Sequence, residues 1–142
     1  MSMLRAHATK TVTTTSGTET MLVRVTAAAN HKVQVRVRVH NQSSTPPVAV
    51  RLLRAATGGT LDTELLAKID SGDSETIQTS CKGFTANAAP GGSPVVLDGG
   101  WITGNGSREF RVVILNGGET LTVAALSTGA TASVQTEVDI DE

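Results

Sequence analysis

The cysteine and the histidines of this sequence are the side chains that could form a nucleophile–base pair. Cys81 is the single cysteine, and His7, His31 and His40 are the only histidines. A catalytic thiol needs a nearby base and a third group that orients the base. No local signature places a histidine beside Cys81, so we expect Cys81 to be a small buried or half-buried side chain. The sequence therefore predicts no catalytic residue, and we expect a protein that is not an enzyme.

Metal and cofactor sites need donors at defined spacings, and the sequence lacks these spacings. His31 and His40 stand at opposite ends of one predicted strand, too far apart to share an ion. The segment Asp70–Glu75, DSGDSE, offers oxygen donors but does not match the twelve-residue calcium loop. The pieces TGGT, PGGSP, DGG and GNGS lack the phosphate-loop and dinucleotide patterns. We therefore predict no metal and no cofactor, and these glycine-rich pieces are predicted turns.

Binding residues are easier to nominate than catalytic ones. Lys32, Arg36, Arg38 and His40 share one face of a predicted strand that could bind a phosphate or an acidic partner. A formal net charge of -1 and an aromatic content of 2% argue against nucleic acid and against a membrane surface. Trp101, the only tryptophan, is expected in the core, with an interface or a sugar-stacking role as the alternatives. Arg36, Arg38 and Trp101 are thus candidate interface residues.

The stretch from residue 31 to residue 41, HKVQVRVRVHN, is the predicted strand that positions the basic candidates. Its valines alternate strictly with long polar residues, which is typical of a half-buried strand. Turn formers recur every eight to twelve residues along the rest of the chain and predict eight or nine short strands in all. We therefore predict an all-β fold, an antiparallel two-sheet β-sandwich that is jelly-roll-like. The segment 61–69, LDTELLAKI, fits a short helix or a strand, and the sequence does not decide between them.

The first twenty residues, MSMLRAHATKTVTTTSGTET, are rich in threonine and show little amphipathic pattern. They predict an extended N-terminal arm over residues 1–20, followed by a sandwich domain over residues 21–142. Such an arm is either a mobile terminus or a segment that adds to the sheet of a neighbouring subunit. In the second case Thr11, Thr13 and Thr15 are candidate interface residues.

Charge predicts one strand pairing. Arg36 and Arg38 lie on the polar face of the long valine-rich strand, while Glu137 and Asp139 lie on the polar face of the last strand. Opposite charges that face each other across an antiparallel ladder contribute roughly 0.2 to 1 kcal/mol per pair. We therefore expect the early long strand and the last strand to be neighbours.

Cysteine content and hydropathy indicate where the chain is made. A single cysteine allows no internal disulfide, and the apolar runs are too short to cross a bilayer. Met1–Lys10 lacks the apolar core of a secretory signal. We expect a soluble product of the cytoplasm.

Three stretches together resemble small β-sandwich virion proteins encoded among the structural genes of tailed bacteriophages. They are VAVRLLRAATGGT from Val48, ETIQTSCKGFTANAAPGG from Glu75 and VVLDGGW from Val95, within the C-terminal two-thirds of the chain. The resemblance implies a virion structural protein, above all a capsid decoration or cement protein that binds the major capsid protein and clamps neighbouring subunits. It also implies a jelly-roll-like fold, a homo-oligomer with a trimer favoured, and a place on the capsid surface after synthesis in the host cytoplasm. It carries over no catalytic residue.

Two other functions remain as alternatives. One is a tail, fibre or adaptor component of the virion. The other is a carbohydrate-binding β-sandwich module, which usually displays several aromatic side chains on one face. This chain has only Phe84, Trp101 and Phe110 to offer.

Overall fold

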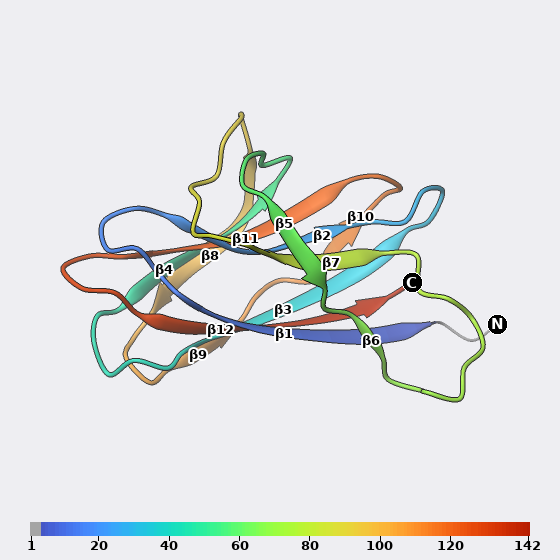
Figure 1. The fold of residues 1–142 in the computed structure, drawn as a ribbon, viewed down its shortest axis with the longest axis horizontal. Helices are drawn as coiled ribbons and strands as arrows, with labels where there is room; N and C mark the ends of the chain where they lie inside the picture. The colour runs from blue at the N-terminus through green and yellow to red at the C-terminus, as the bar shows by residue number, and fades with distance from the viewer. Residues whose placement is uncertain (1–3) are drawn as a thin grey trace.

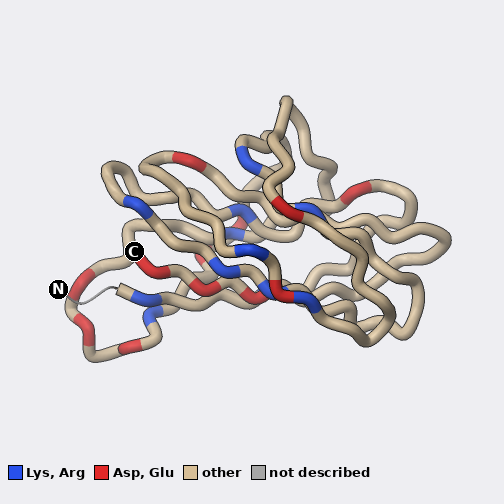
Figure 2. Tube along the Cα trace, turned by 180° about the vertical axis from the view of Figure 1, so that it is seen from behind, with Lys and Arg blue, Asp and Glu red and all other residues tan. Residues whose placement is uncertain are grey.

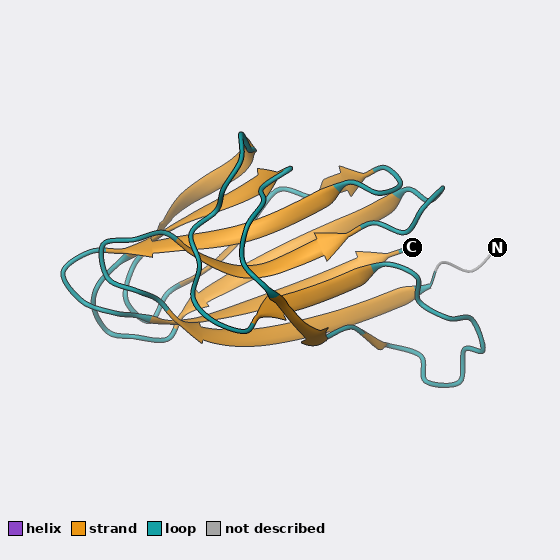
Figure 3. Ribbon diagram, turned by 45° about the horizontal axis from the view of Figure 1, so that its top comes forward, coloured by secondary structure: helices purple, strands orange, loops and turns teal. Residues whose placement is uncertain are grey.

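The structure, a computed structural model, describes residues 4–142. Within this range the chain forms twelve β-strands, arranged as two six-stranded antiparallel sheets that pack as a sandwich (Figure 1). Figure 3 shows the two layers of strands, with the loops gathered mainly at their ends. The predicted all-β sandwich is confirmed, whereas the predicted number of eight or nine strands was too low.

Each sheet draws its strands from the whole length of the chain. Sheet 1 contains β1 (Arg5–Thr13), β3 (Val33–Asn41), β6 (Ala67–Lys68), β9 (Ser107–Glu109), β10 (Val113–Leu115) and β12 (Ser133–Asp141). Sheet 2 contains β2 (Thr20–Thr26), β4 (Val48–Arg54), β5 (Leu61–Glu64), β7 (Ser80–Phe84), β8 (Val95–Ile102) and β11 (Thr120–Ser127). The order in sheet 1 is β10-β3-β12-β1-β6, with β9 also paired to β3, and the order in sheet 2 is β5-β7-β2-β11-β4-β8.

The core lies between the two sheets and consists mainly of small aliphatic side chains. On β3 the four valines, Val33, Val35, Val37 and Val39, are all buried, and the residues between them are half-buried or exposed. Strict alternation thus places one face of the strand in the core, as the sequence pattern predicts. The inner faces of β2, β4, β11 and β12 contribute further valines, leucines and alanines.

The predicted N-terminal arm is not observed. Residues 5–13 form β1, which lies between β12 and β6 in sheet 1, and residues 1–3 lie outside the described residues. β1 pairs with β12 over nine residues, from Arg5 opposite Asp141 to Thr13 opposite Ser133. Its inward side chains Ala6 and Ala8 are buried, but they are too small to give the strong hydrophobic signal of a valine-rich strand. This explains why the sequence pattern did not reveal the strand.

The strand pairing predicted from charge is confirmed. β3 and β12 are antiparallel neighbours, and their register places Arg38 opposite Glu137 and Arg36 opposite Asp139. β12 therefore lies between the first strand of the chain and the long valine-rich strand, with its acidic side chains on the outer face of sheet 1.

The ambiguous segment 61–69 contains two short strands and no helix. β5 pairs with β7 in sheet 2, and β6 pairs with β1 in sheet 1. Two residues separate them, so the chain crosses from one sheet to the other on this side of the sandwich. The strand alternative is thus the correct one, and the helix-like spacing of the leucines arises because the segment is divided between two sheets.

Candidate functional site

The outer face of β1, β12 and β3 carries the densest group of charged and polar side chains. We call this surface the ladder face. Its members alternate with the buried residues of the same strands: His7, Thr9, Arg36, Arg38, His40, Glu137 and Asp139. Because the three strands are adjacent and in register, side chains far apart in the sequence meet here.

One row of the ladder face joins a carboxylate, an imidazole and a hydroxyl. Nδ1 of His7 lies 2.7 Å from Oδ1 of Asp139, and Nε2 of His7 lies 2.9 Å from Oγ1 of Thr9. The same order of groups activates a nucleophile in hydrolases. Here, however, His7 and Asp139 are largely exposed, and β1 and β12 pair with each other along the whole strand. Within residues 4–142 this row therefore lacks the water-excluded setting and free backbone donors that an oxyanion site needs.

A second row joins β3 to β12. Nε2 of His40 lies 3.0 Å from Oε2 of Glu137, and this hydrogen bond is the main reason why the pKa of Glu137 lies below its ordinary value. Burial is the next largest effect and opposes this lowering, and Coulombic interactions with His40, Arg38 and His7 lower the pKa further. Arg38 itself lies 3.4 Å from Glu109 on β9. Acidic partners thus pair with Arg38 and His40, two of the four basic residues that the sequence nominated for binding an anion.

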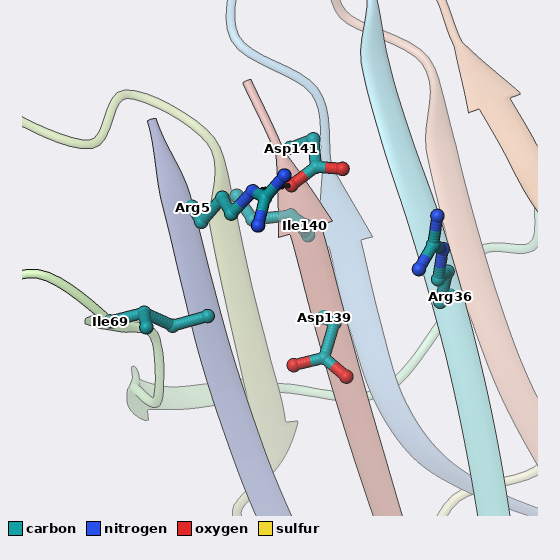
Figure 4. Close-up of a pocket in the computed structure, with 6 residues that line it drawn as sticks. All are labelled: Arg5, Arg36, Ile69, Asp139, Ile140 and Asp141. Atoms are coloured by element: carbon teal, nitrogen blue, oxygen red, sulfur yellow. Dashed lines mark ion pairs between the residues drawn. The ribbon is translucent and has the colours of Figure 1, made fainter. Parts of the chain in front are cut away.

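The ladder face has a shallow hollow of about 280 Å³ near the ends of the chain (Figure 4). The ion pair of Arg5 with Asp141, 3.3 Å between Nε and Oδ1, borders the hollow, and Arg36 and Asp139 line it farther along. Ile69, from the loop after β6, contributes an apolar side chain that is 61% exposed. The hollow combines two guanidinium groups with two carboxylates, so it does not select one sign of charge.

A different kind of surface lies on β8, the outermost strand of sheet 2. Among residues 4–142 its only strand partner is β4, and Val95, Val96 and Trp101 are all more than half exposed. The expectation that Trp101 lies in the core is therefore wrong, because this side chain is 60% exposed. The register places Trp101 opposite Ala49, which is too small to cover an indole. Large exposed apolar side chains on an uncovered edge strand are typical of a protein contact.

The predicted interface residues fall into three places. Thr11 and Thr13 project from β1 onto the same outer face as Arg36 and Arg38, with β12 between the two pairs. Thr15 lies outside this group, in the connection from β1 to β2, where its hydroxyl accepts a hydrogen bond from Asn87 at 3.0 Å. Trp101 lies on sheet 2.

Sequence reasoning did not identify His7 and Thr9 as neighbours of Asp139, because their strand was interpreted as an arm. The alternation of alanines with polar residues is a weak signal of this strand. Ala6 and Ala8 alternate with His7 and Thr9, and a nine-residue pairing with the last strand brings His7 opposite Asp139.

The remaining candidate, Cys81, is fully buried on β7, as expected. Burial, with a smaller contribution from the nearby charge of Glu64, raises the pKa of its thiol to about 12. The thiolate is the nucleophilic and metal-binding form, so this side chain is chemically inert in the folded protein.

Within the part of the chain that the structure describes, no group of three or more His, Cys, Asp and Glu side chains is arranged to hold a metal ion. Nor do residues 4–142 include a helix that is long and apolar enough to span a membrane. Comparison with known proteins finds no matching family model, no matching curated protein and no matching solved structure. The similarity to phage virion proteins therefore stays a prediction.

Proposed function

We propose that this chain is a virion structural protein, and specifically a capsid decoration protein that binds the outer shell and clamps neighbouring capsid subunits. The observation that carries this proposal is the exposed apolar edge of β8 with Trp101, Val95 and Val96. Tryptophan is enriched among the residues that dominate binding energy in protein interfaces. A rigid sandwich that presents such an anchor is suited to holding other proteins together.

The strand order supports the same class of function. Both sheets have the connectivity expected for two nested Greek keys. The relevant order is β1-β12-β3-β9/β10 in sheet 1 and β2-β11-β4-β8 in sheet 2. We infer from this order that the sandwich is a jelly roll, an architecture found in viral capsid and lectin domains. Because one fold hosts many functions, the order supports the class and not the individual role.

The proposed partner is the major capsid protein, and the proposed location is the outside of the capsid after synthesis in the host cytoplasm. We also propose that the chain acts as a homo-oligomer, with a trimer favoured. In such a role the mixed-sign ladder face avoids strong repulsion between copies crowded on one shell.

Immunogold electron microscopy tests the proposal. Particles released by the organism that carries the gene should bind antibody against this chain evenly over their heads, and particles from a gene-deletion strain should not. Purified wild-type protein added to the deletion particles should restore the labelling, whereas Trp101→Glu should not. Thr128→Asp, in the exposed turn after β11, is the matched control and should restore it.

Other outcomes count against this assignment. Gold over tails or fibres would instead support the alternative of a tail, fibre or adaptor component. Unlabelled particles would contradict a virion role altogether.

The exposure of Trp101 also favours a second candidate, a carbohydrate-binding module, because an exposed indole can stack on a sugar ring. The other two aromatic side chains, Phe84 and Phe110, are buried, so only one aromatic platform is available. A glycan array read with wild-type protein and Trp101→Ala tests this candidate. Binding that depends on Trp101 would support it.

A further inference from the structure

The exposed apolar side chains lie on two opposite sides of the sandwich. Five of the seven large ones lie on β8 or in the segment that contains β10: Val95, Val96, Trp101, Val112 and Ile114. The remaining two, Leu61 and Ile69, lie on β5 and directly after β6. Because β8 and β5 are the two edges of sheet 2, and β10 and β6 are the two edges of sheet 1, these groups face away from each other.

Contacts between the sheets hold β8 and the segment that contains β10 together on one side of the sandwich, which we call the β8 side. The backbone N–H of Arg111, just before β10, donates a hydrogen bond of 2.9 Å to Oδ2 of Asp98 on β8. The guanidinium of Arg108 occupies the space that a side chain at Gly100 would take. The edges of the two sheets therefore meet on this side of the sandwich, and each carries exposed apolar side chains: Ile114 projects from the outer face of sheet 1 and Trp101 from the outer face of sheet 2.

The opposite side is acidic. Between residues 61 and 79, which we call the acidic segment, five carboxylate side chains accompany a single lysine: Asp62, Glu64, Asp70, Asp73 and Glu75. Four of the five are exposed, and Figure 2 shows acidic residues spaced along the loop beside the N-terminal end of the chain. Lys68 directs its ammonium group at the carbonyl oxygens of Asp73 and Glu75. Glu64 turns back to accept hydrogen bonds from backbone N–H groups, including that of Cys81, whereas the carboxylates of the loop after β6 keep an excess of negative charge facing outward.

The β8 side carries the complementary charge. Arg108, Arg111 and Lys32 are exposed, and none of them forms an ion pair with another residue in the range 4–142. Two carboxylates lie nearby. Asp98 accepts hydrogen bonds from two backbone N–H groups and offsets part of the charge of Arg108 and Arg111, while Glu109 pairs with Arg38.

We propose that the acidic segment of one copy of this chain docks against the β8 side of a second copy. Ile69 and Leu61 would meet the apolar surface around Trp101, while the carboxylates would meet Arg108, Arg111 and Lys32. The two surfaces differ, so the contact is head-to-tail and generates a closed ring or an open chain of copies. This inference rests on the proposed function for its biological purpose, because linked copies can clamp a shell, but its test does not use the particle.

Sedimentation equilibrium of the full-length chain, with two single variants and their mixture, tests the contact. Trp101→Glu disables the β8 side and Ile69→Asp disables the acidic segment, and each should weaken self-association at least about tenfold. Mixed together, the two variants retain one intact copy of each surface, so they should form a heterodimer and nothing larger. Emission from the single tryptophan, which only the Ile69→Asp partner contributes, should shift to the blue in the mixture.

Thr128→Asp, on an exposed turn, should associate like the wild type and serves as the control for added charge. Raising the salt from about 0.15 M to about 1 M shortens the screening length from about 8 Å to about 3 Å and should weaken association. All tested positions are exposed, so thermal unfolding should show each variant folded.

Three results would overturn the inference. The first is a wild-type chain that stays monomeric at every concentration. The second is self-association that Trp101→Glu abolishes but Ile69→Asp does not. The third is a mixture of the two variants that fails to form the heterodimer. The second result would point to symmetric pairing of two β8 edges instead. Particle labelling without self-association would leave the proposed function intact and remove only this contact.

Discussion

At the scale of single residues, the inner face of β12 contains a polar group without a partner. The hydroxyl of Thr136 is fully buried and has no hydrogen-bond partner among residues 4–142. A buried polar group in this state costs about 1 to 3 kcal/mol relative to a satisfied one. We therefore expect Thr136→Val, which keeps the shape of the side chain, to raise the free energy of unfolding by about 1 kcal/mol in urea titrations.

Thr122→Val is the matched control for this prediction. Thr122 is also fully buried, but its hydroxyl accepts a hydrogen bond of 3.0 Å from Nε of Arg24. Loss of this hydrogen bond in Thr122→Val should lower the free energy of unfolding. Equal effects of the two substitutions would contradict the difference in their hydrogen bonding.

Glu137 gives the ladder face a predictable response to acid. Its hydrogen bond with His40 keeps the pKa of the folded carboxyl below the ordinary value of 4.5. The unfolded chain therefore takes up a proton first as the pH falls, so the contribution of Glu137 to stability is complete above pH 4.5 and declines below it. We expect Glu137→Gln to be less stable than wild type at pH 7, with the difference shrinking as the pH falls below about 4.5.

Urea midpoints measured at several pH values would check this response. Glu75→Gln is the control, because Glu75 is an exposed carboxylate that forms no ion pair within residues 4–142. A gap between wild type and Glu137→Gln that stays constant across pH would show that the carboxylate charge does not matter.

At the scale of elements, β1 is the strand whose role changed most between sequence and structure. Ala8 points into the core and is 2% exposed, while Thr11 on the same strand points outward. An aspartate at position 8 would bury an unpaired charge, which costs several kcal/mol. We expect Ala8→Asp to lose cooperative thermal unfolding and Thr11→Asp to keep it.

This pair of variants separates a strand from an arm. If residues 5–13 formed an arm outside the sandwich, both variants would unfold like the wild type. Circular dichroism at increasing temperature is sufficient to distinguish the two outcomes.

The strands that the sequence predicted well are those in which large apolar residues alternate with charged ones. β3 is the clearest case, since four valines alternate with long polar side chains. The charges on β3 and β12 also predicted correctly that these two strands are neighbours. Local pattern was informative there because one face of each strand is buried and the other is solvated.

Strands with small or mixed residues could not be predicted from such a pattern. The alanines of β1 carry too little hydrophobic signal, and segment 61–69 is divided between two sheets. The exposure of Trp101 depends on β8 being the last strand of its sheet, which is a property of topology and not of neighbouring residues. For the same reason, the His7–Asp139 contact emerged only once β1 and β12 were known to pair.

At the scale of the whole molecule, the described ends of the chain meet. The backbone N–H of Glu142 donates to the carbonyl of Leu4 at 2.8 Å, and that of Leu4 donates to the carbonyl of Glu142 at 3.2 Å. A short flexible linker could join them without disturbing sheet 1. We expect a circular permutant with joined ends and new termini in the exposed turn at residues 128–130 to fold cooperatively.

Thermal unfolding followed by circular dichroism would check the permutant. A second permutant opened between Arg36 and Val37, in the middle of β3, is the control and should fail to fold. Failure of the first permutant as well would mean that the continuity of β11 and β12 through their turn is essential.

The pairing of β1 with β12 also determines how the molecule responds to force. A pull applied between residues 4 and 142 acts on one end of this antiparallel ladder, so its hydrogen bonds break one pair after another, at low tension. A pull applied between Thr15, near the other end of β1, and residue 142 loads all nine pairs in shear at the same time. The protein is therefore mechanically weak when held by its two ends and strong when held across the length of the ladder. A protein that bears tension on a shell would need to be gripped in the second way.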